Sequence, residues 1–434
     1  MSSNKKFYIK TFGCQMNVYD GLRIAAMLEH HGFERTESIS DADIILLNTC
    51  AVRAKATDKV YSALGRIRRA KKPNAIYGIV GCVARESGAG AFRKIKDLNF
   101  VLGPQSYHKL PEILNDPNTK LLDINLSGLE KFDELPPITK SPLVAYIPIQ
   151  EGCNHCCTYC IVPYTRGPEI SRPYSEIIAE TMHSANVGAI EICFLGQNVN
   201  GYKYTDKNGN TYRLSDIIRE TAKINSVQRI RFTSSYPTEM TDDLIDMFRT
   251  EPKLLPFLNM PIQSGSEKIL QKMNRPYDLS GYLEIINKFK SARPDIQISS
   301  DFIVGFPGET ESDFEQTMDI AKNVKFINSY SFKYSPRPHT AAALMQNQIP
   351  ENIKSERLIK LDSILNENQR EFNLSCIDKT FNCLYEGPDK TGTNHIYRTP
   401  YMQPCIVTTD NPTNLANIKI TSANKSCLHG EIVD

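Results

Sequence analysis

Short apolar runs separated by helical stretches recur along most of this 434-residue chain. In the first part they lie at 7–9, 44–47, 76–80 and 100–102, and each is nearly continuous rather than alternating. Strands of this kind are buried on both faces, as they are in a parallel sheet covered by helices. The pattern therefore predicts an α/β fold, with an open parallel-sheet domain over residues 4–116.

A second series of strand-like runs follows a polar stretch rich in proline and asparagine. We expect residues 117–140 to form a linker, because the apolar rhythm is lost there. The second series of runs predicts a larger βα-repeat domain over residues 141–372, which ends in a charged helical segment at 351–373. Short β-prone runs broken by Gly, Pro and Asn predict a small β-barrel over 373–434. The apolar runs of the second series lie at 144–149, 189–195, 229–233, 257–262, 296–304 and 326–332.

Composition narrows the class of protein. The formal net charge of +2 creates no overall electrostatic field strong enough to indicate nucleic-acid binding. The one basic run, at 66–72, is equally well explained as a solvated helix end. The chain has no apolar N-terminal segment and no run of about eighteen apolar residues, so we expect a cytoplasmic protein. In a reducing cytosol, twelve cysteines point to metal or redox chemistry rather than to disulfides.

Three cysteines directly follow the first strand of the second series. Cys153, Cys157 and Cys160 have gaps of three and then two residues. Iron–sulfur clusters are held by cysteine thiolates, often four, so three thiolates leave one iron free to bind a small molecule. Zinc is the alternative, since His155 lies between Cys153 and Cys156, but a closed zinc site normally needs a second ligand pair downstream, which we do not find. The position after a barrel-type strand favours the cluster, with Cys156 unligated.

Three further cysteines each come just after a predicted strand of the first series. They are Cys14, Cys50 and Cys82, and no local motif joins them. The carboxyl ends of parallel strands share one edge, where open α/β sheets bind ligands. The three thiols could therefore converge on a second site. The alternative is that they are unrelated small core residues.

The sequence around these cysteines resembles the radical S-adenosylmethionine methylthiotransferases. The resemblance rests on Tyr159 and the following 161–167, and on the segments at 13–17, 48–53 and 81–84. It implies a partial (β/α) barrel that binds S-adenosylmethionine at a [4Fe-4S] cluster held by the central cysteines. It also implies a second [4Fe-4S] cluster on the three N-terminal cysteines, and a C-terminal RNA-binding β-barrel of the TRAM type.

Polar segments at the ends of the later strands are candidates for holding the cofactor. The segment 195–202 contains two amide side chains and a glycine, and amides suit the polar groups of a bound amino acid, although such a segment can also be a plain turn. Segments at 234–237, 261–266 and 301–309 are similar to family segments that line the cofactor. The residues that the resemblance assigns to this role are Gly196, Gln197, Asn198, Ser234, Gln263 and Val304.

The substrate side departs from the family pattern at two positions. Asn259 stands where the family usually has His, and His339 stands where it usually has Gly. In the C-terminal module, Tyr397, Arg398 and Tyr401 are candidates for base stacking and a phosphate contact. A structural cap on the barrel domain is the alternative role for that module.

Two short segments indicate the branch of the family. Residues 15–17 and 52–53 resemble the MiaB-type branch, which modifies tRNA, rather than the RimO-type branch, which modifies a ribosomal protein. The implied reaction replaces the C2 hydrogen of N6-isopentenyl-adenosine at tRNA position 37 by a methylthio group, using two S-adenosylmethionine molecules. The alternatives are methylthiolation of threonylcarbamoyl-adenosine or of a ribosomal protein, and a noncatalytic iron–sulfur RNA-binding protein.

The expected partners follow from the same resemblance. They are the anticodon stem-loop of tRNA and an electron donor such as a flavodoxin or ferredoxin, with the chain itself a monomer. No catalytic acid or base can be assigned from the sequence.

Overall fold

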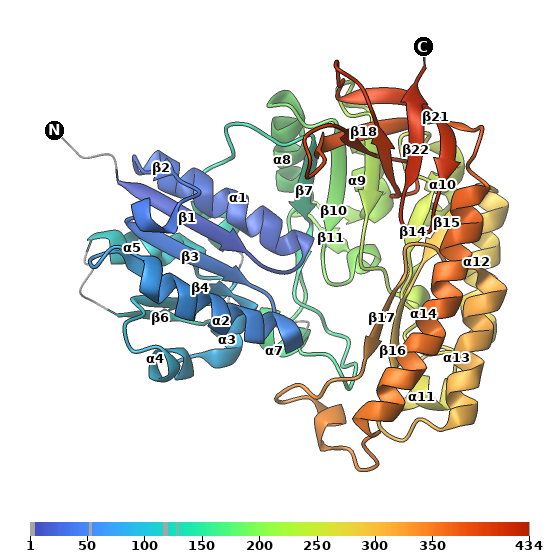
Figure 1. Ribbon diagram of the computed structural model, residues 1–434, viewed down its shortest axis with the longest axis horizontal. Helices are drawn as coiled ribbons and strands as arrows, with labels where there is room; N and C mark the ends of the chain where they lie inside the picture. The colour runs from blue at the N-terminus through green and yellow to red at the C-terminus, as the bar shows by residue number, and fades with distance from the viewer. Residues whose placement is uncertain (1–4, 52–53, 116–119, 127, 129, 434) are drawn as a thin grey trace.

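A computed structural model describes residues 5–433 apart from 52–53, 116–119, 127 and 129 (Figure 1). The N-terminal part is a six-stranded parallel sheet in the order β2-β1-β3-β4-β5-β6. Helices lie along both faces, and two separate apolar cores form, one on each face. The strands are β1 (Lys6–Thr11), β2 (Glu34–Arg35), β3 (Ile44–Thr49), β4 (Ile76–Gly81), β5 (Phe100–Leu102) and β6 (Leu121–Asp123).

The apolar runs of the first series explain this sheet. Every residue of β3 and β4 is buried, as expected of central strands covered on both faces. The predicted open parallel sheet is therefore confirmed. The helices that connect its strands are α1 (Gln15–His30), α2 (Ala54–Ala70), α3 (Cys82–Ser87), α4 (Gly90–Lys94), α5 (Leu110–Asn115) and the short turns at 39–41 and 107–109.

Described parts of the segment predicted to be a linker, 117–140, pack against the sheet. Its strand β6 pairs with β5, and its helix α6 (Glu130–Glu134) buries the side chain of Lys131. The sequence did not predict these two elements, because a three-residue edge strand and a single polar helical turn leave no clear periodicity. The positions of the domain boundaries stay predictions.

The central part is an interrupted barrel of parallel strands with helices outside (Figure 1). Strands β13, β10 and β7 form one sheet, and β14–β15 and β16–β17 form two further parallel pairs. The largest apolar core lies between these strands and the surrounding helices. The strands are β7 (Val144–Pro148), β10 (Glu191–Leu195), β13 (Arg229–Phe232), β14 (Phe257–Asn259), β15 (Gln297–Ser299), β16 (Asp301–Val304) and β17 (Tyr330–Lys333).

Helices and two small antiparallel pairs complete the central part. The pairs are β8 (Gln150–Glu151) with β9 (Ile170–Ser171), and β11 (Lys203–Thr205) with β12 (Thr211–Arg213). The helices are α7 (Val162–Arg166), α8 (Tyr174–Asn186), α9 (Leu214–Ala222), α10 (Asp242–Thr250), α11 (Glu267–Lys272), α12 (Leu279–Ala292) and α13 (Glu311–Val324), with short turns at 199–201, 237–239 and 341–344.

Two predicted runs differ from the observed strands. The run at 296–304 is two short strands, because the chain is interrupted at Ser300, whose hydroxyl accepts the Ile262 N–H at 2.9 Å. The run at 326–332 becomes a strand only at Tyr330, since Asn328 has a φ of 46°, which a strand cannot contain. The first two residues of that run are buried without pairing in a strand.

The C-terminal part is a closed five-stranded barrel, as predicted, reached through the long helix α14 (Glu351–Leu374). Its anchor on the central sheet is the buried guanidinium of Arg229 in β13, which donates to the carbonyls of Asn382, Arg398 and Thr399 at 3.2, 2.9 and 3.1 Å. The strands run in the order β18 (Thr380–Pro388), β19 (His395–Arg398), β20 (Pro404–Val407), β22 (Leu428–Ile432) and β21 (Leu415–Ala423).

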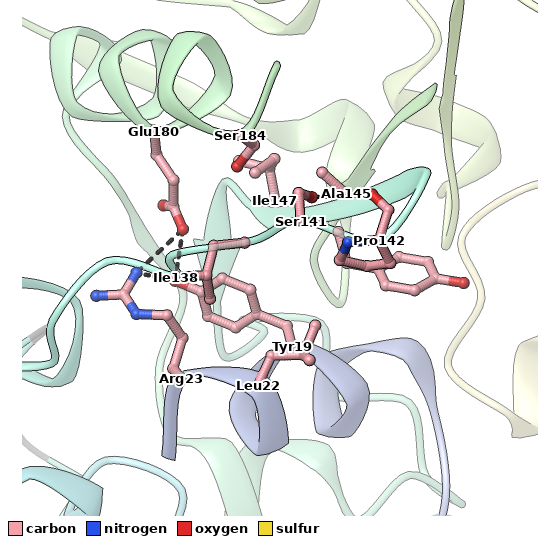
Figure 2. A pocket seen from close by; sticks show the side chains of 11 residues that line it. Tyr19, Leu22, Arg23, Ile138, Ser141, Pro142, Ala145, Ile147, Glu180 and Ser184 are labelled. Carbon is pink, nitrogen blue, oxygen red and sulfur yellow. Dashed lines mark hydrogen bonds and ion pairs between the residues drawn. The ribbon is translucent and has the colours of Figure 1, made fainter. Parts of the chain in front are cut away.

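The N-terminal sheet docks on the central part through helix α1. Figure 2 shows a small crevice where Tyr19 and Arg23 of α1 face Glu180 of α8. Arg23 pairs with the Glu180 carboxylate at 3.1 Å, and the Tyr19 hydroxyl donates to the same oxygen at 2.9 Å. Because all three side chains are largely buried, this contact fixes helix α1 and the N-terminal sheet against β7 and α8.

None of the described helices is both long and apolar enough to cross a membrane.

Candidate functional site

The loop that carries the three central cysteines follows β7 and β8 and is held by backbone hydrogen bonds. Gly152 has a φ of 75°, and a Cβ at this position would lie 1.9 Å from the Pro168 carbonyl oxygen, so only glycine fits. The loop is held further along by Thr158, which donates its N–H to the Met273 carbonyl and accepts the N–H of Ala342. The sharp turn at Gly152 therefore sets the direction of the chain into the first cysteine.

The structure brings Cys153, Cys157 and Cys160 together, each partly exposed. Burial, together with the neighbouring sulfurs, raises the pKa of Cys153 to about 12. Burial likewise raises the pKa of Cys160 to about 11. The thiols of Cys153 and Cys160 are therefore protonated near neutral pH until a cation replaces their protons, as is usual when thiolates bind a metal.

The zinc alternative finds no support in this loop. The His155 ring stacks on Tyr236, with centroids 3.7 Å apart, and its Nε2 lies 3.0 Å from a Glu239 oxygen. Cys156 is exposed, with its sulfur near the Asn154 carbonyl. Within the described parts of the chain, no three His, Cys, Asp or Glu side chains are arranged around a single metal ion. An iron–sulfur cluster does not need that arrangement, because each thiolate binds a different iron.

The three N-terminal cysteines follow β1, β3 and β4, which are adjacent in the sheet. Cys14 and Cys50 approach closely because Gly13, with a φ of 117°, has no side chain; a Cβ there would lie 2.1 Å from the Cys50 Cβ. A hydrogen bond with the Cys50 thiol lowers the pKa of Cys14 to about 6. Cys82 is buried and lies within electrostatic range of Cys14. The structure thus gathers three thiols that no sequence motif connects.

A buried amide pair positions these two cysteine turns. Asn17 Nδ2 donates to Asn48 Oδ1 at 2.8 Å and to the Thr49 carbonyl at 3.0 Å, while Asn48 Nδ2 donates to the Asn17 carbonyl. Both asparagines are fully buried. The turn after β1 is therefore locked to the end of β3. Val52 and Arg53, which carried part of the resemblance, lie outside the described residues.

The predicted cofactor segment after β10 presents unpartnered polar atoms. Gln197 Oε1 and Asn198 Oδ1 are buried and accept no hydrogen bond from any described residue. The Ser235 hydroxyl, which follows β13, is also buried and has no hydrogen-bond partner among the described residues. The Asn198 Nδ2 donates to Glu239 Oε2 at 2.6 Å, which fixes the amide. Buried polar atoms without partners are costly, so their grouping at one rim fits a polar ligand.

The other predicted cofactor residues lie at the same strand ends. Ser234 and Gln263 have φ values of 69° and 75°, an uncommon conformation for residues with side chains and one that is found at ligand sites. Val304 is fully buried at the end of β16. Gly196 packs against Gln150, whose Oε1 would lie 2.8 Å from an added Cβ. The structure therefore places all six predicted residues in this rim or directly behind it.

Glu239 was not predicted from the sequence. It accepts from both His155 and Asn198, and these hydrogen bonds outweigh burial and lower its pKa. It joins the cysteine loop to the segment after β10. The only signal in the sequence was its place two residues after the segment 234–237, which resembles a family segment that lines the cofactor.

The structure shows what surrounds Asn259 and His339, the two residues that depart from the family pattern. Asn259 Nδ2 approaches Ser299 Oγ at 3.3 Å across β14 and β15. His339 is exposed, with a φ of 68°, the left-handed conformation that a glycine would adopt freely. Its ring lies 5.8 Å from that of Tyr164, which follows the cysteine loop.

The predicted RNA contacts of the C-terminal barrel were wrong for two residues. Tyr397 is fully buried and its hydroxyl donates to the Thr413 carbonyl, while Tyr401 packs edge-on against Phe372. Tyr397 is a core residue, because inward-facing positions of a small barrel are filled by side chains. Tyr401 lies in the turn between β19 and β20, and its hydroxyl donates to Asp295 of the central part at 3.1 Å. Arg398 is paired with Glu386, which offsets its charge.

Two family models match the chain. One is described as an uncharacterized protein family, UPF0004, over residues 6–103, and the other as the radical SAM superfamily over residues 147–321. The two matches correspond to the N-terminal sheet and the interrupted barrel.

Curated relatives match over the whole length. A tRNA-2-methylthio-N(6)-dimethylallyladenosine synthase of Rickettsia conorii is 45% identical over 444 residues, covering 99% of this chain and 100% of the relative. The enzyme of the same name from Rickettsia canadensis is 45% identical over 443 residues, covering 99% of each chain.

Solved structures with a similar fold are distant in sequence. The radical S-adenosylmethionine methyltransferase TsrM from Kitasatospora setae, with cobalamin and a [4Fe-4S] cluster bound, has a TM-score of 0.55 at 12% identity and covers 79% of this chain and 77% of its own. The cobalamin-dependent S-adenosylmethionine radical enzyme OxsB has a TM-score of 0.51 at 11% identity, with 83% of this chain and 56% of its own covered. At these identities the likeness shows the fold alone.

Proposed function

The chain belongs to the family of tRNA-2-methylthio-N(6)-dimethylallyladenosine synthases, and from this premise we propose that it methylthiolates C2 of N6-dimethylallyladenosine at position 37 of tRNA. Two S-adenosylmethionine molecules are consumed, one as the methyl donor and one as the radical source. The observation that carries the proposal is a pair of cysteine triads, one at the strand ends of each parallel unit, in a chain with this identity to the synthases.

The central triad is the proposed site of the cluster that binds S-adenosylmethionine. Three thiolates would hold three irons, and the fourth iron would take the cofactor. The unpartnered oxygens of Gln197, Asn198 and Ser235 suit the polar end of that cofactor. When bound, the cluster and cofactor supply the radical and methyl-transfer chemistry. The residues of this chain orient them: Cys153, Cys157 and Cys160 as iron ligands, with Gly196, Gln197, Asn198, Ser234, Gln263 and Val304 as cofactor contacts.

The N-terminal triad of Cys14, Cys50 and Cys82 is the proposed site of a second [4Fe-4S] cluster, which would carry the sulfur. Its position supports this role, because α1 begins directly after Cys14 and its first turn enters the barrel. There Met16 packs against Cys193 and Leu195 of β10. This contact places the start of α1, and with it Cys14, against the central barrel, at whose strand ends the proposed radical site lies.

Cysteine variants test both assignments separately. Replacing Cys157 by Ala should abolish reductive cleavage of S-adenosylmethionine, whereas replacing Cys50 by Ala should leave cleavage intact and stop methylthiolation. The measurements are 5′-deoxyadenosine release under anaerobic reduction, and mass analysis of nucleosides from tRNA. Full methylthiolation by the Cys50 variant would refute the sulfur-bearing role.

The substrate is tested in cells lacking the gene. Nucleoside analysis should show loss of the methylthio group from dimethylallyladenosine only. A loss from threonylcarbamoyl-adenosine, or from a ribosomal protein, would reassign the chain within the family.

A further inference from the structure

Four buried charged side chains lie between the two cysteine triads. Asp20 of α1, Lys131 of α6, Glu151 of β8 and Arg166 of α7 are each at most 4% exposed. Lys131 pairs with Asp20 at 3.1 Å and also with Glu151. Arg166 Nη1 donates to both Glu151 oxygens at 3.1 Å, and its Nη2 lies 3.6 Å from Asp20 Oδ2. We call this set the ion cluster.

The ion cluster touches elements from both triads. Glu151 is two residues before Cys153, at the start of the central loop. Helix α7, which ends at Arg166, packs against α3, which begins at Cys82. The Arg166 charge acts on the sulfurs of Cys14 and Cys82. Arg166 is therefore the cation of the ion cluster that faces the N-terminal triad, and Asp20 is the carboxylate that acts on Cys82 from the same side.

The charges in the ion cluster bear on how Arg166 can interact with the N-terminal triad. Two cations and two carboxylates compensate each other, and Lys131 neutralises part of both carboxylates. A guanidinium has five N–H donors and stays charged in proteins. Arg166 Nη2 is buried, and Asp20 Oδ2 lies 3.6 Å from it, beyond hydrogen-bond distance, while the guanidinium also interacts with the Cys82 thiol. A buried donor that its carboxylate partner does not fully satisfy can interact with an anionic ligand beside it.

We propose that Arg166 is a positioning residue that compensates the negative charge of the sulfur ligands gathered at Cys14, Cys50 and Cys82, and that through Glu151 it ties this site to the loop of Cys153. The inference rests on the proposed function, because it requires an iron–sulfur cluster at the N-terminal triad. Thiolates and cluster sulfides are anionic, and in a buried site their nearest cation strongly influences the charge that the cluster can hold.

The proposal predicts the direction of a redox change. Adding an electron makes the cluster more negative, and a nearby cation favours that state. Arg166→Gln should therefore lower the midpoint potential of the N-terminal cluster, and Arg166→Lys should lower it less. Asp20→Asn removes an anion that shares Arg166, so it should shift the potential in the opposite direction.

The measurement is an EPR-monitored redox titration of the full chain in which Cys153, Cys157 and Cys160 are all replaced by Ala, so that only the N-terminal cluster is present. Arg85→Gln is the matched control. Arg85 also lies on α3, but it is only partly buried and donates to backbone carbonyls of Ile124 and Tyr164. Its removal should leave the midpoint potential unchanged.

Opposite shifts for Arg166→Gln and Asp20→Asn, with no shift for Arg85→Gln, would support the proposal. Equal potentials for Arg166→Gln and the parent, or an equal shift in the Arg85 control, would overturn it. If Arg166→Gln holds no iron, the midpoint potentials of Arg166→Lys and Asp20→Asn test the proposal in its place. A parent that binds no N-terminal cluster would instead contradict the proposed function.

Discussion

Lys131 is the position where one substitution should cost the most stability. Its side chain is 1% exposed and its ammonium group pairs with two buried carboxylates, those of Asp20 and Glu151. Lys131→Met keeps the length and apolar stem of the side chain but leaves two carboxylates with Arg166 alone. Removing one partner from a buried ionic group typically costs about 3–5 kcal/mol, because an uncompensated charge remains in the interior.

The expected change is large enough to measure by thermal unfolding of the iron-free protein. In a folding unit of roughly 150–250 residues, 1 kcal/mol corresponds to about 2–4 °C, so Lys131→Met should lower Tm by about 6–20 °C. The control is Lys325→Met, because Lys325 and its partner Glu371 are 65% and 47% exposed. Such a surface pair contributes only about 0–1 kcal/mol, and its loss should hardly change Tm.

A second substitution separates charge from packing. Asp20→Asn in the Lys131→Met background removes the excess negative charge, so the double variant should regain most of the lost stability. A loss below about 1 kcal/mol for Lys131→Met would refute the reasoning. So would a double variant that is less stable than Lys131→Met alone.

Three further predictions concern other parts of the molecule. Burial outweighs the Arg357 ion pair and raises the pKa of Glu309 from 4.5 to about 7. The folded state therefore holds this proton more tightly, and stability should fall by up to about 3 kcal/mol as pH rises from 4.5 to 7. Glu309→Gln should flatten that profile in denaturant unfolding, and an unchanged profile would contradict the assignment. Arg229→Leu should cost about 3–5 kcal/mol, because it removes a buried ion-pair partner of Glu191 and leaves barrel carbonyls unpaired. It should also increase limited proteolysis between α14 and β18, and equal cleavage of the variant and the parent would contradict the prediction. Cys156→Ser should keep iron content and cofactor cleavage within twofold, and loss of the cluster would mean that Cys156 is a ligand.

The sequence by itself determined the local features of this protein. The continuous apolar runs predicted both parallel units, and the spacing of the central cysteines predicted their loop, because each depends on residues close together in the chain. The edge strand β6 and the interrupted run at 296–304 escaped prediction, because their strands are short and their pairing involves distant side chains. Tyr397 and Tyr401 were predicted to contact RNA, but closure of the barrel turns Tyr397 inward, and Tyr401 is buried by its contacts with Phe372 and Asp295.

Only the tertiary structure decided how the two cysteine triads are related. The strand order makes β1, β3 and β4 neighbours, which gathers Cys14, Cys50 and Cys82. The ion cluster draws single residues from α1, α6, β8 and α7, and although Arg166 lies in the segment 161–167, no local pattern indicates that these four side chains meet. A buried charge is stable only when its partner is brought to it. The sequence specifies such partners only through the completed fold.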